Sequence, residues 1–199
     1  MVKQSKQKLS RERILLVARR HFGRYGYRRT SLTGIARDLG VVKGALYYYV
    51  PGGKEELFDA VVTAEEQRLL EAMTRAAEAE TDPRIALRRA VEAKLEALGE
   101  VRRTLAMPRE VGEEIAALVQ SSQRAFDRAE RQLFETLLRR GEQTGVFRSL
   151  RPRCKAAEAL QAMARALELP LVFDTEDASA SASAMNLLFE IIFRGLEER

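Results

Sequence analysis

Apolar residues recur at intervals of three and four positions along most of this chain, and this spacing constrains its fold more than any other feature. Ile14, Leu15, Ala18 and Phe22 follow it near the start, and it continues to the end of the sequence. Such spacing places apolar side chains on one face of an α-helix. The alternation of polar with β-branched or aromatic residues that is typical of strands is absent, and Ala, Leu, Glu and Arg dominate. We therefore predict an all-α protein.

Breaks in the pattern predict about nine helices. Ser10 is a suitable N-cap, Gly23 and Gly26 can end the first helix, and Gly40 suits a sharp turn. The predicted helices span residues 10–26, 31–39, 42–48, 54–80, 83–101, 110–119, 122–140, 153–169 and 176–197. An irregular corner is expected at 102–108 and a turn region at 141–152. Residues 1–54, which begin with a polar and basic arm, and residues 55–199 are predicted to form two domains.

The charges are divided unevenly between these two parts. Residues 1–54 carry 13 Lys and Arg against only Glu12 and Asp38, whereas the rest carries 21 basic and 27 acidic residues. A basic head on an acidic body is typical of a protein that binds nucleic acid. A solvated basic face is the alternative interpretation of the charge alone.

Several classes of protein are not supported by the residue types present. Cys154 is the single cysteine, so neither an internal disulfide framework nor a thiolate metal cluster is expected. His21 is the single histidine, and we expect it to be a packing or surface residue. Adjacent carboxylates such as Glu113 and Glu114 diverge on a helix, so we predict no enzyme activity, no metal and no cofactor. Without an apolar signal core or a run of about 20 apolar residues, a cytoplasmic protein without membrane contact is expected.

Two short predicted helices joined at Gly40 match a helix-turn-helix. The second helix of this motif enters the major groove of DNA, so its outward side chains must be polar or aromatic. Lys43, Gly44, Tyr47 and Tyr48 meet that demand, and at least one of the two tyrosines must be exposed because both cannot be buried on one short helix. Hydroxyl and basic side chains around the start of the preceding helix suit phosphate binding, namely Arg28, Arg29, Thr30, Ser31 and Thr33.

An ordered set of residues in this region resembles the TetR (TetR/AcrR) family of regulators. The set comprises Ala18, Phe22, Gly26, Thr30, Ile35-Ala36, Gly40-Val41, Lys43-Gly44, Leu46-Tyr47 and Lys54-Glu55-Glu56-Leu57. The resemblance implies that Lys43, Gly44, Ala45, Tyr47, Tyr48 and Tyr49 face DNA and that Thr33 and Lys54 contact phosphate. This chain departs from the family pattern at Val42, where Ser is common, and between Val50 and Gly53, which is one residue longer. The complete predicted DNA-contacting set is Arg28, Arg29, Thr30, Ser31, Thr33, Val42, Lys43, Gly44, Ala45, Tyr47, Tyr48, Tyr49 and Lys54.

The same resemblance implies that residues 55–199 bind a small molecule and form a homodimer. The expected protein is a repressor that leaves its palindromic operator when a hydrophobic or amphipathic ligand binds. Predicted ligand contacts are Leu98, Arg102, Met107, Ile115, Leu118, Phe126, Leu133 and Phe134. Apolar stripes on the last two helices, with the Ala/Ser run at 178–184, suggest a dimeric four-helix bundle whose seam is Leu160, Met163, Leu167, Met185, Leu188, Phe189, Ile192 and Phe193.

A non-specific architectural DNA-binding protein remains the alternative function. A basic head would suffice for that role, although the large acidic body with its own core argues against it.

Overall fold

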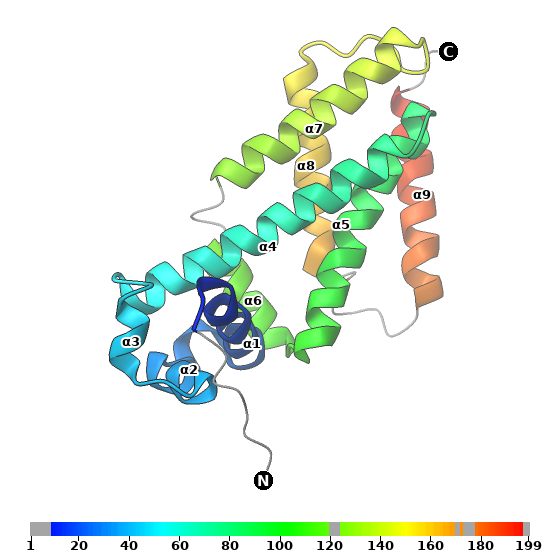
Figure 1. The fold of residues 1–199 in the computed structure, drawn as a ribbon. Helices are drawn as coiled ribbons and strands as arrows, with labels where there is room; N and C mark the ends of the chain where they lie inside the picture. The colour runs from blue at the N-terminus through cyan, green and yellow to red at the C-terminus, as the bar shows by residue number, and fades with distance from the viewer. Residues whose placement is uncertain (1–8, 120–123, 170–171, 173–177, 197–199) are drawn as a thin grey trace. The chain divides into compact units, whose positions relative to one another are not determined.

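A computed structural model describes residues 9–119, 124–169, 172 and 178–196, with the side chains of 124, 169 and 178–184 left aside. Across these residues it contains nine helices and no strand element (Figure 1). They are α1 (Arg11–Arg29), α2 (Leu32–Leu39), α3 (Lys43–Tyr47), α4 (Gly53–Glu78), α5 (Pro83–Leu105), α6 (Arg109–Val119), α7 (Arg124–Gln143), α8 (Arg153–Leu169) and α9 (Ala178–Leu196). The predicted all-α fold is confirmed. None of the helices described is both long and apolar enough to cross a lipid bilayer.

Two predicted boundaries differ from the structure. Gly26 does not end α1; it kinks the helix with a φ of 79°, and helix resumes as far as Arg29. The prediction of an irregular corner at 102–108 is wrong for residues 102–105, because α5 continues to Leu105. Leu105 is buried, and a β-carbon added to Gly23 would lie 2.3 Å from its Cδ1 atom. This close packing of Leu105 on α1 explains why the helix extends so far.

The chain divides into two compact units. The first comprises Met1–Glu65 and Thr104–Leu118, and the second comprises Glu66–Arg103 and Val119–Arg199. The sequence predicts a functional boundary between residues 54 and 55, which differs from the boundaries of these compact units. The functional boundary stays a prediction.

The core of the first unit supports α2 and α3. Ile35 of α2, Leu46 of α3 and Leu57 of α4 are all fully buried. An aromatic cluster extends this core, because the ring of Phe58 meets Phe22 and Tyr27 edge to face at centroid distances of 5.1 and 4.9 Å. The two short helices are therefore held by burial of apolar residues rather than by their own length.

The core of the second unit is a separate apolar cluster. Met73, Leu87, Phe134, Leu138 and Phe147 are among its fully buried members. Helix α7 packs along α8, and α9 adds buried residues to the same cluster.

Candidate nucleic-acid interface

Backbone geometry at Gly40 forms the turn between α2 and α3. The Ser31 hydroxyl caps the start of α2 by accepting a hydrogen bond from the Gly34 N–H at 3.1 Å. At the other end, Gly40 has a φ of 72°, and the N–H of Val41 donates to the Ala36 carbonyl at 3.0 Å. Glycine adopts this left-handed conformation without a steric penalty, so the predicted role of Gly40 is confirmed.

Helix α3 buries one side chain and exposes most of the others. Leu46 is fully buried, whereas Tyr47 and Tyr48 are 42% and 85% exposed. Lys43 is exposed, with its ammonium 5.7 Å from the centre of the Tyr47 ring. A β-carbon added to Gly44 would meet nothing within 4 Å, so the backbone there is open to close approach. The predicted exposure of the tyrosines is thus confirmed.

Other members of the predicted DNA-contacting set fall into two groups. Arg28, Arg29, Ser31, Thr33 and Val42 are exposed. Ala45 and Tyr49 are partly buried, and the Tyr49 hydroxyl donates to the Leu9 carbonyl at 3.0 Å. The side chains of the exposed group are accessible to a ligand without a rearrangement of the protein.

Thr30 requires a correction to the sequence prediction. It is buried, and its hydroxyl donates to the Gly26 carbonyl at 2.7 Å. The Gly26 carbonyl thus accepts a hydrogen bond from the side chain that directly follows the last residue of α1. The hydroxyl is therefore used inside the protein, not presented to phosphate.

Lys54 also has a partner within the head. Its ammonium lies 4.3 Å from the centre of the Tyr27 ring and donates to the Tyr27 carbonyl at 3.1 Å. Gly53, the residue before it, has a φ of 76°. In this position Lys54 joins α4 to the end of α1.

A hydrogen bond between His21 and Asp38 braces α1 against α2. The Nε2 atom of His21 lies 2.8 Å from the Asp38 carboxylate. This bond lowers the pKa of Asp38 below its ordinary value, with the desolvation of the carboxyl acting in the opposite direction. His21 is buried and meets Tyr25 edge to face, so its predicted packing role is confirmed.

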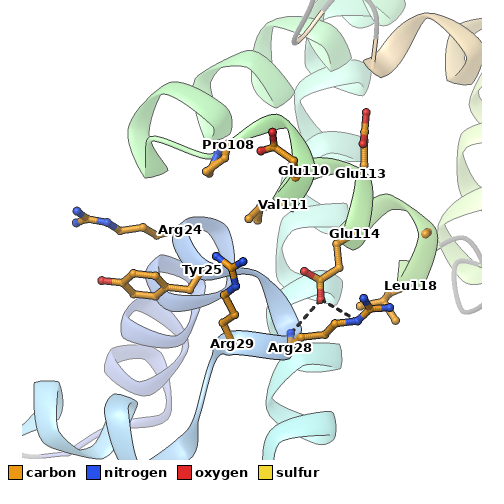
Figure 2. A pocket seen from close by; sticks show the side chains of 11 residues that line it. Arg24, Tyr25, Arg28, Arg29, Pro108, Glu110, Val111, Glu113, Glu114 and Leu118 are labelled. Atoms are coloured by element: carbon orange, nitrogen blue, oxygen red, sulfur yellow. Dashed lines mark hydrogen bonds and ion pairs between the residues drawn. The ribbon is translucent and has the colours of Figure 1, made fainter.

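A groove of about 800 Å³ lies between α1 and α6 in the first unit (Figure 2). Glu114 reaches from α6 to α1, where its carboxylate accepts a hydrogen bond from the Arg28 backbone N–H at 2.9 Å. Arg28 follows the kink at Gly26 by two residues. Leu118 is the one predicted ligand contact among the residues that line the groove. The sequence carried no signal for Glu114, because its partner is a backbone group 86 residues away.

The other predicted ligand contacts do not form one set within either unit. Met107, Ile115 and Leu118 belong to the first unit, whereas Leu98, Arg102, Phe126, Leu133 and Phe134 belong to the second. Phe134 is fully buried in the core of the second unit, and Phe126 is also buried. Arg102 lies within α5, not at a corner, and its guanidinium donates to the Val172 carbonyl at 2.8 Å.

A buried ionic cluster in the second unit was not predicted. The ammonium of Lys94 on α5 lies 2.6 Å from Glu130 on α7 and 2.5 Å from Glu168 on α8, and Gln161 donates to Glu130 at 2.9 Å. Burial alone would lower the pKa of Lys94, but the charges of Glu168 and Glu130 outweigh it and raise the pKa. The available signal was the position of Lys94, which continues the apolar spacing of Leu87 and Val91.

Three of the eight residues of the predicted dimer seam lie in the core of one chain. Leu160, Met185 and Phe189 are buried in the core of the second unit. Met163, Leu188, Ile192 and Phe193 are partly buried against this core, and Leu167 is half-buried. The large exposed apolar residues of α9 are instead Leu187 and Ile191, at 59% and 63% exposure. Close approach through the Ala/Ser run at 178–184 concerns side chains outside those described.

A comparison with protein families finds a match over residues of α1, α2, α3 and the first part of α4. Residues 14–61 match the model for bacterial regulatory proteins of the tetR family. The HTH-type transcriptional regulator LmrA of Bacillus subtilis (strain 168) is 42% identical over 74 residues, which are 37% of this chain and 39% of that protein. The match thus spans well under half of this curated relative. The TetR family transcriptional regulator PfmR from Thermus thermophilus is 27% identical with a TM-score of 0.64, over 94% of this chain and 100% of PfmR. Residues 14–61 are thus similar to the corresponding part of tetR-family regulators.

A further solved structure shares the fold of this chain. It is a transcriptional regulator from Saccharomonospora viridis in complex with choline, 23% identical with a TM-score of 0.69 over 95% of this chain and 98% of that one. The family model covers the helix-turn-helix, so this sequence likeness includes α2 and α3 described above.

Proposed function

We propose that this chain regulates transcription by binding double-stranded DNA through α3. The observation that carries the proposal is that this one-turn helix buries one side chain in the core and exposes others to solvent. Leu46 holds it in the core, while Lys43, Tyr47 and Tyr48 are exposed on it. An exposed helix of this kind fits the major groove, where Lys donates to guanine and aromatic rings contact thymine methyl groups.

Phosphate contacts position such a helix on the duplex. Arg28, Arg29, Ser31 and Thr33 are exposed around the start of α2 and suit this role. Thr30 is excluded from it by its bond to Gly26, and Lys54 must leave Tyr27 before its ammonium can reach a phosphate.

We further propose a homodimer that binds a palindromic operator as a repressor. A two-fold dimer presents two copies of α3 to half-sites one helical turn apart, about 34–36 Å. Leu187 and Ile191 on α9 offer exposed apolar area for such an interface. Burying that area between two chains removes it from water, which favours association.

The body is proposed to bind a small hydrophobic or amphipathic effector that releases the repressor from DNA. Support comes from the choline complex of a protein with this fold. The ligand must bind the two states of the repressor with different affinity, because equal affinity would shift no population. Its chemical identity is for screening to establish.

Selection of bound duplexes from a random pool tests the proposal directly. The expected result is one palindromic sequence that is bound at least about 10³-fold more tightly than bulk DNA at physiological salt. Equal affinity for selected and bulk DNA would instead identify a non-specific architectural protein. Failure to bind either duplex would reject DNA binding itself.

A further inference from the structure

We propose that the groove between α1 and α6 binds a small zwitterion with an apolar body, such as a short peptide with free ends. In this site Arg29 binds the carboxylate of the ligand and Glu110 binds its ammonium. All residues that line the groove belong to the first unit, so the site is separate from the effector site proposed for the body.

The groove has the size and the lining of a ligand site. Its volume of about 800 Å³ lies within the range of about 300–1,000 Å³ that is usual for small-molecule pockets. Tyr25 on α1 and Val111 and Leu118 on α6 give it apolar surface (Figure 2). Tyr25 and Leu118 are both exposed. A ligand with an apolar body removes this surface from water, which favours binding.

A contact between the two walls holds the groove in shape. The Glu114 carboxylate accepts a hydrogen bond from the Arg28 backbone N–H at 2.9 Å. A β-carbon added to Gly26 would lie 2.3 Å from the other oxygen of this carboxylate, so glycine allows the close approach. The walls are thus positioned before a ligand binds, which lowers the entropy cost of binding.

Charges on the two walls identify the ligand as a zwitterion. The carboxylates of Glu113 and Glu114 are already paired with arginines. Arg29 and Glu110 are exposed on opposite walls, and neither forms an ion pair among the residues that the structure describes. Arg24 adds a second exposed guanidinium to the α1 wall. A plain anion would be repelled by the carboxylates of α6 and a plain cation by the guanidiniums of α1, whereas a zwitterion suits both walls.

Calorimetric titration without DNA tests the site with three peptides that share one apolar body. Leucyl-phenylalanine carries both charges, its N-acetyl derivative lacks the ammonium, and its C-terminal amide lacks the carboxylate. The free dipeptide should bind at least about fivefold more tightly than either derivative, because each derivative loses one charge-assisted hydrogen bond. Tighter binding of the acetyl derivative would identify a plain anion site, and tighter binding of the amide a plain cation site. Either result overturns the proposal.

Two variants assign the two charges to their residues. Arg29→Gln should lower the affinity for the free dipeptide to that of the amide, and it should leave the affinity for the amide unchanged. Glu110→Gln should act in the same way relative to the acetyl derivative. Both side chains are exposed, so the thermal unfolding midpoint should stay at the wild-type value. Equal losses for all three peptides would contradict this assignment.

Matched controls remove one charge of each sign elsewhere in the first unit. Arg11→Gln on α1 and Glu55→Gln on α4 change exposed side chains that do not line the groove. Both controls should bind the three peptides with wild-type affinity. Losses as large as those of the groove variants would show that only net charge matters. Failure of every peptide to bind the wild-type chain at saturable sites would reject the site.

The effect of this ligand on DNA binding rests on the proposed function. Arg29 is among the exposed side chains proposed to contact phosphate, and a ligand carboxylate competes for the same guanidinium. Saturating dipeptide should therefore weaken binding to the selected operator at least about threefold, and Arg29→Gln should abolish this effect. Unchanged operator affinity would overturn the competition. If no duplex is selected at all, the proposed function fails, and calorimetry without DNA still decides whether the groove binds a zwitterion.

Discussion

On α3, the side chain that stabilises the fold differs from the side chains that are proposed to bind DNA. Leu46 is fully buried, and its neighbour Tyr47 is exposed on a helix of only one turn. A change at Leu46 therefore acts on stability, whereas changes at Lys43 or Tyr47 act on the outer surface. This separation makes the proposed interface testable without unfolding the protein.

Tyr47→Ala and Lys43→Ala should each weaken operator binding by about 1–3 kcal/mol, the range for a good base contact. Titration of a labelled operator measures the loss, and thermal unfolding should show an unchanged midpoint. Tyr25→Ala is the matched control, because Tyr25 is similarly exposed on α1. Wild-type affinity in both α3 variants would refute the placement of the recognition helix.

Asp38 gives the head a dependence on acidic pH. The hydrogen bond from His21 lowers the pKa of Asp38 in the folded state below the ordinary value of 3.8. A carboxyl of this kind stabilises the fold above its unfolded pKa, and this contribution is lost as the pH falls through the lower folded value. Asp38→Ala should thus lower the urea midpoint at pH 6, and the gap to wild type should narrow below pH 3.8. A gap that stays constant with pH would contradict this assignment.

Helices of the second unit meet at points where side-chain size is fixed. At the end of α7, a β-carbon added to Gly141 would lie 1.9 Å from the buried ring of Phe147. On α9, a β-carbon added to Gly195 would meet nothing within 4 Å. The same substitution therefore has opposite consequences at these two helical positions.

Gly141→Ala should destabilise the chain by about 1–3 kcal/mol, as overpacking does. Gly195→Ala should leave stability unchanged or raise it by up to about 1 kcal/mol, because alanine favours helix. Urea unfolding compares the two variants. Similar midpoints would mean that Phe147 can move away at little cost.

The ionic cluster joins three helices, so its removal should affect them together. Lys94→Met leaves Glu130 buried without its cation, and such a loss costs about 3–5 kcal/mol. The paired variant Lys94→Met with Glu130→Leu should recover part of it, because it removes the fully buried carboxylate and leaves only that of Glu168, whose side chain is 27% exposed. Urea unfolding of the single and double variants measures the recovery. A double variant less stable than the single would show that the cluster stabilises by more than charge balance.

For the whole molecule, the functional unit is proposed to be larger than one chain. In the proposed complex one copy of α3 contacts one half-site, and a palindrome requires two copies in a fixed relation. Leu187 and Ile191 are four residues apart on α9, so they share a face of that helix.

Replacing both by glutamate should yield a monomer at micromolar concentration and weaken operator binding at least tenfold. Stability should change little, since both side chains are exposed in the single chain. Sedimentation measures the mass, and Ile85→Glu, an exposed position on α5, is the control. A dimer that persists in the double variant would locate the interface on another surface.

The amino-acid pattern alone was enough for the fold class and the motif. The local spacing of apolar residues predicted the all-α architecture, and Gly40 predicted a turn that needs positive φ. Because Tyr47 and Tyr48 lie side by side on one short helix, at least one of them had to be exposed. These features depend on neighbours in sequence, and periodicity records such neighbours directly.

Tertiary structure decided every feature that depends on distant partners. The hydroxyl of Thr30, which was predicted to bind phosphate, donates to the Gly26 carbonyl inside the protein. Glu114 accepts a hydrogen bond from the Arg28 backbone N–H, which is 86 residues away in the sequence. Phe189 lies in the core of its own chain. The sequence could not show this, because an apolar stripe on a helix does not indicate which surface covers it. Periodicity shows that a face is buried, but only packing in three dimensions selects the partner that buries it.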